Sequence, residues 1–404
     1  MMMRILNQPD RFVVSVLGEQ TPQDGIEYRR SIFTIAEGNA LFNALTGEAV
    51  ADASEGELMR RWFYVPTWMD EYTLAYITRQ RHIQMQKRPG IMISTVVVYL
   101  TTGCNASCEY CFEQGYKVMT MTEQTAKDAA EWVAQRCDKS KALSVRWFGG
   151  EPLTNIRAIN AFCETLDGLG VSYHSDMFTN GDLMNEASDE DLKKWRLKSL
   201  QLTIDDIGDE YAKIKGLPAG AFDRIAEQIT RLCNKGLRIR IRTHFRGDAK
   251  ACQRVADTFS GTENLSMYPM LLYGGGKLED YEKLLSIEEY LIDHGLMRAK
   301  FPRIRYGANC MADSPSTVCI TPDGHLSPCE HFAYGEDYGS IYERKVNVTM
   351  LRKWADQERN HCGKCLLYPL CSRTVACPGV GACSPERQYY EIATIKRALR
   401  SANR

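Results

Sequence analysis

The chain has 404 residues, of which 44% are hydrophobic, and its 50 basic and 51 acidic side chains leave a formal net charge of −1. This length is enough for two or three domains, and the balanced charge gives no overall attraction to nucleic acid or to an anionic membrane. No run approaches the roughly twenty apolar residues that cross a bilayer, and residues 1–10 lack the apolar core of a signal peptide. We therefore expect a cytoplasmic protein that binds neither nucleic acid nor membrane.

Residues 1–92 are expected to form a small α+β domain. Residues 12–17 and 31–35 are rich in apolar and β-branched side chains, and a Gln-Asp-Gly turn between them predicts a hairpin. Helices are predicted at residues 38–45, 55–63 and 69–85, before a Pro-Gly pair at 89–90 ends the pattern.

Strands and helices alternate along residues 93–300. A capping box from Thr120 to Glu123 predicts a helix start. Strands are predicted at residues 94–100, 143–148, 171–178, 200–204, 238–245 and 265–273, with further helices at 156–166 and 222–233. Repeated βα units predict an α/β fold with a parallel sheet or barrel, whose active site lies at the carboxyl ends of the strands.

Fifteen cysteines are unevenly placed: three lie between residues 104 and 111, and eight lie between residues 310 and 383. Disulfide frameworks are typical of short secreted chains, whereas clustered thiols in an intracellular chain more often bind metal. Regular periodicity fades after residue 300, so we expect residues 301–404 to form a cysteine-rich domain whose fold depends on bound metal. The other cysteines, Cys137, Cys163, Cys233 and Cys252, are not expected to be ligands.

The first cluster, Cys104, Cys108 and Cys111, directly follows a predicted buried strand. Three thiolates on one loop can bind one 4Fe-4S cluster and leave one iron without a protein ligand. An open iron can bind the amino and carboxylate groups of S-adenosylmethionine. The spacing alone also allows a four-ligand cluster or a zinc site completed by a distant residue.

The CxxxCxYC motif, with Tyr110 at its aromatic position, resembles the signature of the radical S-adenosylmethionine (radical SAM) superfamily. The resemblance implies a partial (β/α)6 barrel, a 4Fe-4S cluster on the three cysteines, and reductive cleavage of S-adenosylmethionine to a 5′-deoxyadenosyl radical. It also implies cofactor contacts at the GGEP-like and TNG-like segments and at polar residues that end later strands. These residues are Gly149, Gly150, Glu151, Pro152, Thr179, Asn180, Thr203, Asp205 and Arg242.

The eight later cysteines match the number that two fully ligated 4Fe-4S clusters need. Their order resembles the SPASM domain, the auxiliary-cluster module of peptide-modifying radical enzymes, although five residues rather than three separate Cys371 from Cys377. The resemblance implies that Cys310, Cys319, Cys329 and Cys377 hold one auxiliary cluster and that Cys362, Cys365, Cys371 and Cys383 hold another. Two zinc sites would need the same number of thiolates and stay open as an alternative.

Similar enzymes act on peptides or proteins, so the resemblance implies a precursor peptide with a leader, and an electron donor such as flavodoxin or ferredoxin. About ninety residues precede Cys104. Sulfatase maturases of this type begin close to that motif, whereas many peptide maturases have a leader-binding domain there. A peptide maturase that forms a thioether or carbon–carbon crosslink is therefore preferred over a formylglycine-forming maturase. A non-enzymatic zinc or iron–sulfur protein is the alternative from another class.

Glu330 directly follows Cys329, where the sulfatase maturases carry an aspartate base. A glutamate beside the first auxiliary cluster could take a proton from a substrate thiol or hydroxyl, and it is our candidate catalytic residue. A solvated surface glutamate is the alternative.

Overall fold

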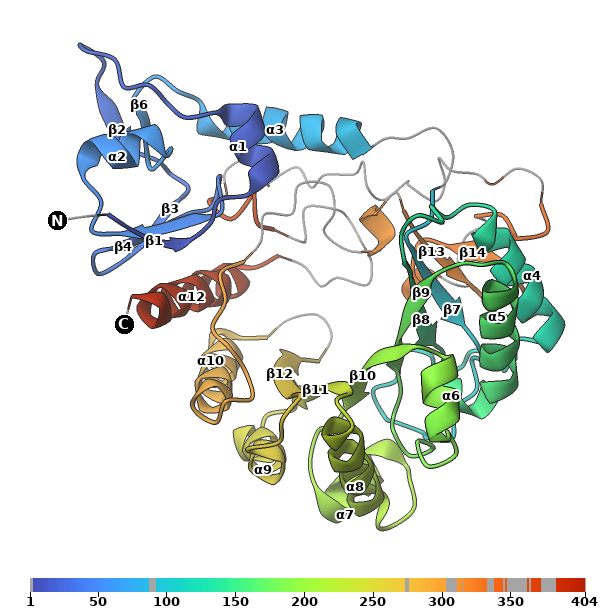
Figure 1. The fold of residues 1–404 in the computed structure, drawn as a ribbon. Coiled ribbons are helices and arrows are strands. Elements are labelled where there is room, and N and C mark those ends of the chain that lie inside the picture. The colour runs from blue at the N-terminus through green and yellow to red at the C-terminus, as the bar shows by residue number, and fades with distance from the viewer. Residues whose placement is uncertain are drawn as a thin grey trace.

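We describe a computed structural model of the chain. It describes residues 3–86, 92–272, 276–302, 311–314, 316–332, 338–343, 346, 362, 365–371 and 383–403. In Figure 1, a curved sheet with helices on its outer side occupies one part of the molecule, and a smaller α+β unit lies beside the final helix in the other.

Six parallel strands form most of the largest sheet, and one or two helices follow each of them in the chain. The strands are β7 (Thr95–Tyr99), β8 (Leu143–Phe148), β9 (Tyr173–Phe178), β10 (Leu197–Thr203), β11 (Arg238–Phe245) and β12 (Leu265–Leu271). The helices are α4 (Glu123–Ala134), α5 (Ile156–Gly168), α6 (Asp189–Lys194), α7 (Gly208–Lys215), α8 (Ala221–Asn234), α9 (Ala249–Phe259) and α10 (Leu278–Asp293). The strands are ordered by sequence from β7 to β12, and they confirm the predicted partial (β/α)6 barrel.

The two faces of this sheet have different surroundings. Val145, Trp147 and Met177 are buried against the outer helices, together with Ile239 and Ile241. Every second residue of β8 and β9 is only half-buried, because the inner face opens toward the barrel interior. Alternation of this kind places polar and aromatic side chains on the inner face of the sheet.

The C-terminal region extends the same sheet. Strand β13 (Thr317–Ile320) pairs in parallel with β7, and β14 (Leu326–Ser327) pairs with β13 in the antiparallel sense. Two short 3₁₀ helices flank this pair, η2 (Met311–Asp313) and η3 (Glu330–Phe332), and the final helix α12 spans Pro385–Ala402. None of these elements was predicted. The short strands between cysteines carry almost no periodicity, whereas the 18-residue helix α12, capped by Ser384, was missed.

The N-terminal unit contains a four-stranded antiparallel sheet in the order β1-β5-β4-β3 and a two-stranded sheet of β2 and β6. Its elements are β1 (Arg4–Asn7), α1 (Arg11–Leu17), β2 (Tyr28–Arg30), β3 (Thr34–Glu37), β4 (Ala40–Asn43), β5 (Glu48–Ala51), α2 (Glu55–Arg60), β6 (Tyr64–Pro66) and α3 (Glu71–Gln86). Helices α2 and α3 agree with the prediction.

Two predicted elements of this unit are wrong. Residues 12–17 form helix α1 rather than a strand, because the Asp10 carboxylate accepts hydrogen bonds from the backbone N–H groups of Phe12 (3.0 Å) and Val13 (3.1 Å) and caps the helix. Residues 38–45 form strand β4 rather than a helix. Gly38, at φ 58°, begins a tight turn that pairs Glu37 with Ala40.

The capping box at residues 120–123 was placed two residues too early. The N-cap of α4 is Thr122, whose hydroxyl accepts from the backbone N–H of Thr125 at 3.0 Å. Thr120 instead forms a β-bridge with Thr101 and closes the cysteine loop.

Among the described residues, no helix has the length and apolar character needed to cross a membrane.

One apolar cluster joins the N-terminal sheet to the C-terminal region. Phe33 and Phe42 of the N-terminal unit share it with Leu367 and Tyr368, and with Leu399 of α12. Figure 1 shows α12 beside β3 and β4. A buried ion pair between Arg397 of α12 and Glu288 of α10 also ties this helix to the barrel.

Candidate radical SAM site

The loop after β7 carries Cys104, Cys108 and Cys111 at the carboxyl end of the sheet. Two hydrogen bonds join the beginning of this loop to its end. Thr102 N–H donates to Met119 O (2.9 Å), and the Thr102 hydroxyl donates to Lys117 O (2.8 Å). Cys104 is exposed and the other two thiols are half-buried. Although part of the Cys104 residue is exposed, desolvation of its thiol by the surrounding loop raises the thiol pKa to about 11. The thiolate form of Cys104 is therefore disfavoured, and a bound metal would have to stabilise it.

The two glycines of the GGEP-like segment let the end of β8 touch the cysteine loop. Gly150 N–H donates to Thr101 O (2.8 Å), and Glu151 N–H donates to Gly103 O (3.0 Å). A Cβ on Gly149 would lie 2.5 Å from Thr101 O, and one on Gly150 would lie 2.3 Å from Gly103 O. Only glycine fits at these positions, so the segment sets where the cysteine loop lies.

The carboxylate of Glu151 is fully buried and holds the TNG-like segment in place. It accepts hydrogen bonds from the Thr179 hydroxyl (2.8 and 3.0 Å) and from the backbone N–H groups of Asn180 (2.8 Å) and Leu153 (3.0 Å). Burial raises the pKa of Glu151 to about 7. The Asn180 side chain in turn reaches Cys104 Sγ at 3.7 Å. The predicted residues Gly149, Gly150, Glu151, Thr179 and Asn180 therefore lie together around the loop.

A buried polar network lies beneath the same loop. The Tyr110 hydroxyl hydrogen-bonds Asp205 and accepts from Lys215 Nζ at 2.6 Å. His244 donates its backbone N–H to Asp205 Oδ1 at 2.8 Å, and its ring lies against Tyr110 at 4.8 Å. Burial alone would raise the pKa of Asp205, but the His244 hydrogen bond and the Lys215 charge lower it overall. Two predicted cofactor-binding residues, Tyr110 and Asp205, therefore contact each other, and the same network includes Lys215 and His244, which were not predicted.

Thr203 and Arg242 meet further along the barrel wall. They face each other across the β10–β11 pair, and Arg242 donates to the Thr203 hydroxyl from Nε (3.3 Å) and Nη2 (3.2 Å). Arg242 is half-buried on the inner side of β11, so its guanidinium keeps donors for a bound anion such as a carboxylate.

Aromatic rings form a wall between the cysteine loop and the C-terminal region. The Phe148 ring packs against Tyr99 (5.4 Å), Phe178 (5.7 Å) and Phe112 (6.5 Å), and Phe112 packs against His331 (4.5 Å). This wall brings η3, which begins at Glu330, to the residue that follows Cys111.

Two carboxyl groups lie at this wall, each with one oxygen that is buried without a hydrogen-bond partner among the described residues. These atoms are Glu330 Oε2 and Glu113 Oε1. Burial raises the pKa of Glu113 to about 7, an effect that Tyr99 reduces and the charge of Glu330 increases. Glu330 is half-buried and is therefore not the solvated surface residue considered as its alternative.

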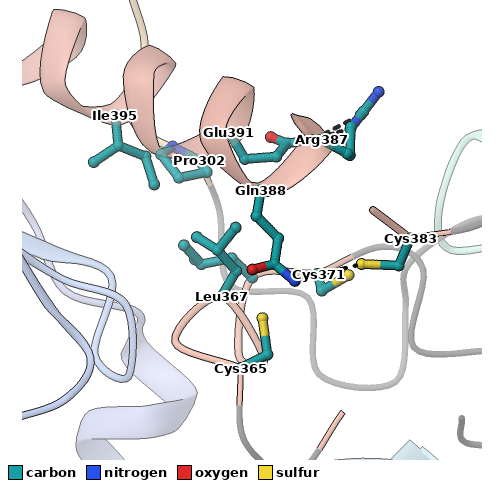
Figure 2. Close-up of a pocket in the computed structure, with 10 residues that line it drawn as sticks. Pro302, Cys365, Leu367, Cys371, Cys383, Arg387, Gln388, Glu391 and Ile395 are labelled. Atoms are coloured by element: carbon teal, nitrogen blue, oxygen red, sulfur yellow. Dashed lines mark hydrogen bonds and ion pairs between the residues drawn. The ribbon is translucent and has the colours of Figure 1, made fainter. Parts of the chain in front are cut away.

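The described later cysteines fall into two places. Cys319 lies on β13 opposite Val97, close enough to Cys329 and Glu330 for burial and their charges to raise its thiol pKa well above the usual value. Cys365, Cys371 and Cys383 instead line a cavity of about 270 Å³ at the start of α12. Figure 2 shows their side chains turned toward this cavity beneath Gln388, whose Nε2 donates to Cys383 Sγ at 3.8 Å.

Cys362 is half-buried in the adjoining apolar cluster, and its carbonyl accepts from Cys365 N–H at 3.2 Å. Cys310 and Cys377 lie outside the described residues. Among the cysteines that were not expected to be ligands, Cys163, Cys233 and Cys252 are buried.

Within the described ranges, no three metal-binding side chains are close enough to hold a single ion. A four-iron cluster separates its ligands more than one ion does, and the donors at each place are mainly thiols, which suits an iron–sulfur cluster. Three such thiols on one loop, with the Asn180 amide beside Cys104 and the half-buried Arg242 on the same sheet, are the kinds of group that suit a cluster and S-adenosylmethionine.

Sequence reasoning missed several site residues. Lys215 and His244 belong to no motif, and their buried contacts became visible only with the fold. Phe148 and Phe178 were read only as strand residues, although their places at strand ends, before the GGEP-like and TNG-like segments, put them at the barrel mouth. Glu113, two residues after Cys111, was also missed.

These features define a protein with a radical SAM fold and a cysteine-rich C-terminal extension. Residues 98–248 match the sequence profile of the radical SAM superfamily, so the chain contains a radical SAM domain. A curated relative, GTP 3′,8-cyclase of Clostridium perfringens (strain 13 / Type A), is 22% identical over 284 residues, which cover 62% of this chain and 84% of the relative.

Two solved structures share the fold. The structure of anSMEcpe with bound AdoMet and the Kp18Cys peptide has a TM-score of 0.61 and 17% identity, covering 76% of this chain and 99% of that one. Streptococcus suis SuiB bound to precursor peptide SuiA has a TM-score of 0.52 and 12% identity, covering 86% of this chain and 95% of that one.

Proposed function

We propose that the protein is a radical SAM peptide maturase. The observation that carries the proposal is the closeness of two thiol sites across one aromatic wall: the Cys104, Cys108 and Cys111 loop on one side, and Cys319, Cys329 and Glu330 on the other. A substrate held at this wall would lie between a radical source and an electron acceptor. A cytoplasmic location, with flavodoxin or ferredoxin as electron donor, belongs to the same proposal.

In this proposal the loop thiols hold the first 4Fe-4S cluster, and Tyr110, Gly149, Gly150, Glu151, Pro152, Thr179, Asn180, Thr203, Asp205 and Arg242 surround S-adenosylmethionine. When bound, the cluster and S-adenosylmethionine would supply the radical that removes a substrate hydrogen. Arg242 offers its free donors to the cofactor carboxylate, and Asn180 stands beside Cys104. Glu151 acts on the cofactor indirectly, by fixing Asn180 and Thr179.

Two auxiliary clusters complete the proposed cofactor set. Cys319 and Cys329 belong to the first, with Cys310 and Cys377 as further ligands, and Cys362, Cys365, Cys371 and Cys383 hold the second. The cavity shared by Cys365, Cys371 and Cys383 supports the second group. The domain division at residues 92 and 300 is retained as part of this proposal.

Glu330 is proposed as the base that takes a proton from a substrate thiol or hydroxyl when a crosslink forms. Its Oε2, which has no hydrogen-bond partner in the described part of the chain, could accept that proton. Glu330→Gln should abolish crosslinked product but leave S-adenosylmethionine cleavage intact. The exposed Glu343 offers a matched control, and Glu343→Gln should retain both activities. Undiminished crosslinking by Glu330→Gln would contradict its role.

The N-terminal unit is proposed to bind the leader of a precursor peptide. Among the described strands, β1 lies at one edge of its sheet and has exposed residues, whereas the opposite edge, β3, contacts α12. A leader could add to β1 by β-augmentation. The likeness to SuiB, which extends over 86% of the chain, supports this assignment. Amide exchange in β1 should slow when the peptide binds, and unchanged exchange in the presence of bound peptide would exclude this edge.

The decisive experiment is anaerobic reconstitution with iron and sulfide, followed by addition of dithionite and S-adenosylmethionine, with and without a candidate precursor peptide. About twelve irons per chain and 5′-deoxyadenosine that disappears in Cys104→Ala would support the proposal. Zinc in place of iron, without cofactor cleavage, would instead identify a non-enzymatic metal protein.

Formylglycine formation is the second candidate, and the likeness to anSMEcpe, an anaerobic sulfatase maturase, supports it. The extra N-terminal sheet favours the peptide maturase, because it adds a strand edge that formylglycine formation does not need. Mass spectrometry separates the two products. A thioether or carbon–carbon crosslink removes a pair of hydrogen atoms and forms no aldehyde, whereas formylglycine contains an aldehyde that a hydrazide probe captures.

A further inference from the structure

Lys215 is a buried cation that no part of the proposed chemistry uses. Only 3% of the residue is exposed, although it ends helix α7 next to a loop. Lys213, two positions earlier on the same helix, has a side chain that is 78% exposed. Burying an ammonium group is costly unless it is paired, so the position of Lys215 calls for a specific reason.

The partners of this ammonium group belong to the buried network below the cysteine loop. Nζ donates to the Tyr110 hydroxyl at 2.6 Å and lies 3.8 Å from Asp205 Oδ2. It also lies 5.1 Å from the ring centre of Tyr110 and 5.9 Å from that of Tyr211. Asp205 is itself 1% exposed. The two charges are therefore fixed in a medium where electrostatic effects are larger than in water.

The backbone holds this pair of charges against the loop that carries the thiols. The Lys215 carbonyl accepts from Ser107 N–H at 2.8 Å, next to Cys108. Gly216 packs so closely that a Cβ on it would lie 2.0 Å from Ser107 Oγ. Tyr110, which hydrogen-bonds both charged groups, lies between Cys108 and Cys111, so Lys215 and Asp205 are both tied to the middle of the cysteine loop.

We propose that Lys215 is a positioning residue that raises the reduction potential of the cluster held by Cys104, Cys108 and Cys111, and that Asp205 opposes it. Three thiolates make the bound cluster anionic, and reduction adds one more negative charge. A buried cation beside Cys108 stabilises the reduced form more than the oxidised form, and a buried anion does the reverse. This inference rests on the proposed function, which assigns the cluster to these cysteines.

The test is a redox titration of the reconstituted protein, followed by the electron paramagnetic resonance signal that changes when S-adenosylmethionine is added and is absent in Cys104→Ala. Lys215→Met should lower the potential by at least the 59 mV that corresponds to a tenfold change in the ratio of oxidised to reduced cluster. Asp205→Asn should shift the potential upward. Lys213→Met, on the exposed face of the same helix, should leave it unchanged.

Opposite shifts in the two buried variants distinguish an electrostatic effect from general loosening of the loop, which would move both in one direction. Unchanged potentials, or shifts of the same sign, would overturn the inference while the proposed function survives. If Lys215→Met fails to assemble the cluster, Asp205→Asn decides by the sign of its shift. A wild-type protein without any signal assigned to these cysteines would contradict the proposed function itself.

Discussion

Replacing Gly150 with alanine should separate the end of β8 from the cysteine loop. The new methyl carbon would lie 2.3 Å from Gly103 O and 3.1 Å from Thr102 O, and both neighbours are backbone atoms that cannot rotate away. Overpacking of this kind costs about 3 kcal/mol, at the upper end of the usual range. That loss lowers the equilibrium constant for folding by roughly a hundredfold.

Urea unfolding of the iron-free protein, monitored by tryptophan fluorescence, measures the effect, because the fully buried Trp147 lies on β8. The same displacement moves the loop that carries Cys104, so iron bound per chain should also fall. Gly168→Ala is the control, since a Cβ on Gly168 meets nothing within 4 Å at the end of α5. Wild-type urea resistance together with wild-type iron content in Gly150→Ala would refute the steric reasoning.

Three further outcomes are expected. Glu288→Ala leaves Arg397 buried without its carboxylate and should cost about 3–5 kcal/mol in thermal unfolding, whereas replacing both residues with leucine should recover most of the loss. The pKa of Glu151 is about 7 in the folded protein, above its ordinary value of 4.5, so ionisation of this group favours unfolding. The free energy of unfolding of the iron-free protein should therefore fall by up to about 3 kcal/mol as the pH rises from 4.5 to 7. The Glu151→Gln variant should not show this fall. Cys362 and Cys365 pack against the apolar cluster that contains residues of β3 and β4. Removing iron with a chelator should therefore speed amide hydrogen exchange in these two strands. Faster exchange confined to residues 365–371 would contradict this prediction.

The parallel sheet could be predicted from the sequence because its strands are either apolar runs, as in β7, or regular alternations of apolar and polar residues, as in β11. The prediction failed where local pattern and tertiary pairing disagree. The apolar residues 12–17 carry the composition of a strand, but a single carboxylate at Asp10 starts a helix there. Strand β4 has the composition of a helix, and only its pairing with β3 and β5 makes it extended.

The candidate site divides in the same way. Thiols and glycines could be recognised because their chemistry depends on residue type and spacing within one segment. Asp205 and Lys215 lie about a hundred residues after Tyr110 in the chain, and both hydrogen-bond its hydroxyl. No pattern within one segment could have predicted these contacts. The hydrogen bonds of Glu151 could not be predicted for a similar reason: three of the four come from Thr179 and Asn180, which directly follow the next strand, β9.

The apolar cluster around Phe33, Phe42, Leu367 and Leu399 limits how far this architecture can be treated as interchangeable modules. A chimaera that exchanges only the first ninety residues would set a foreign sheet against Leu367, Tyr368 and α12, whose shapes match the native one. A workable exchange must therefore carry residues 365–371 and α12 along with the N-terminal unit. The smallest unit that could be moved into another protein is therefore discontinuous in sequence, and it includes the cavity lined by Cys365, Cys371 and Cys383.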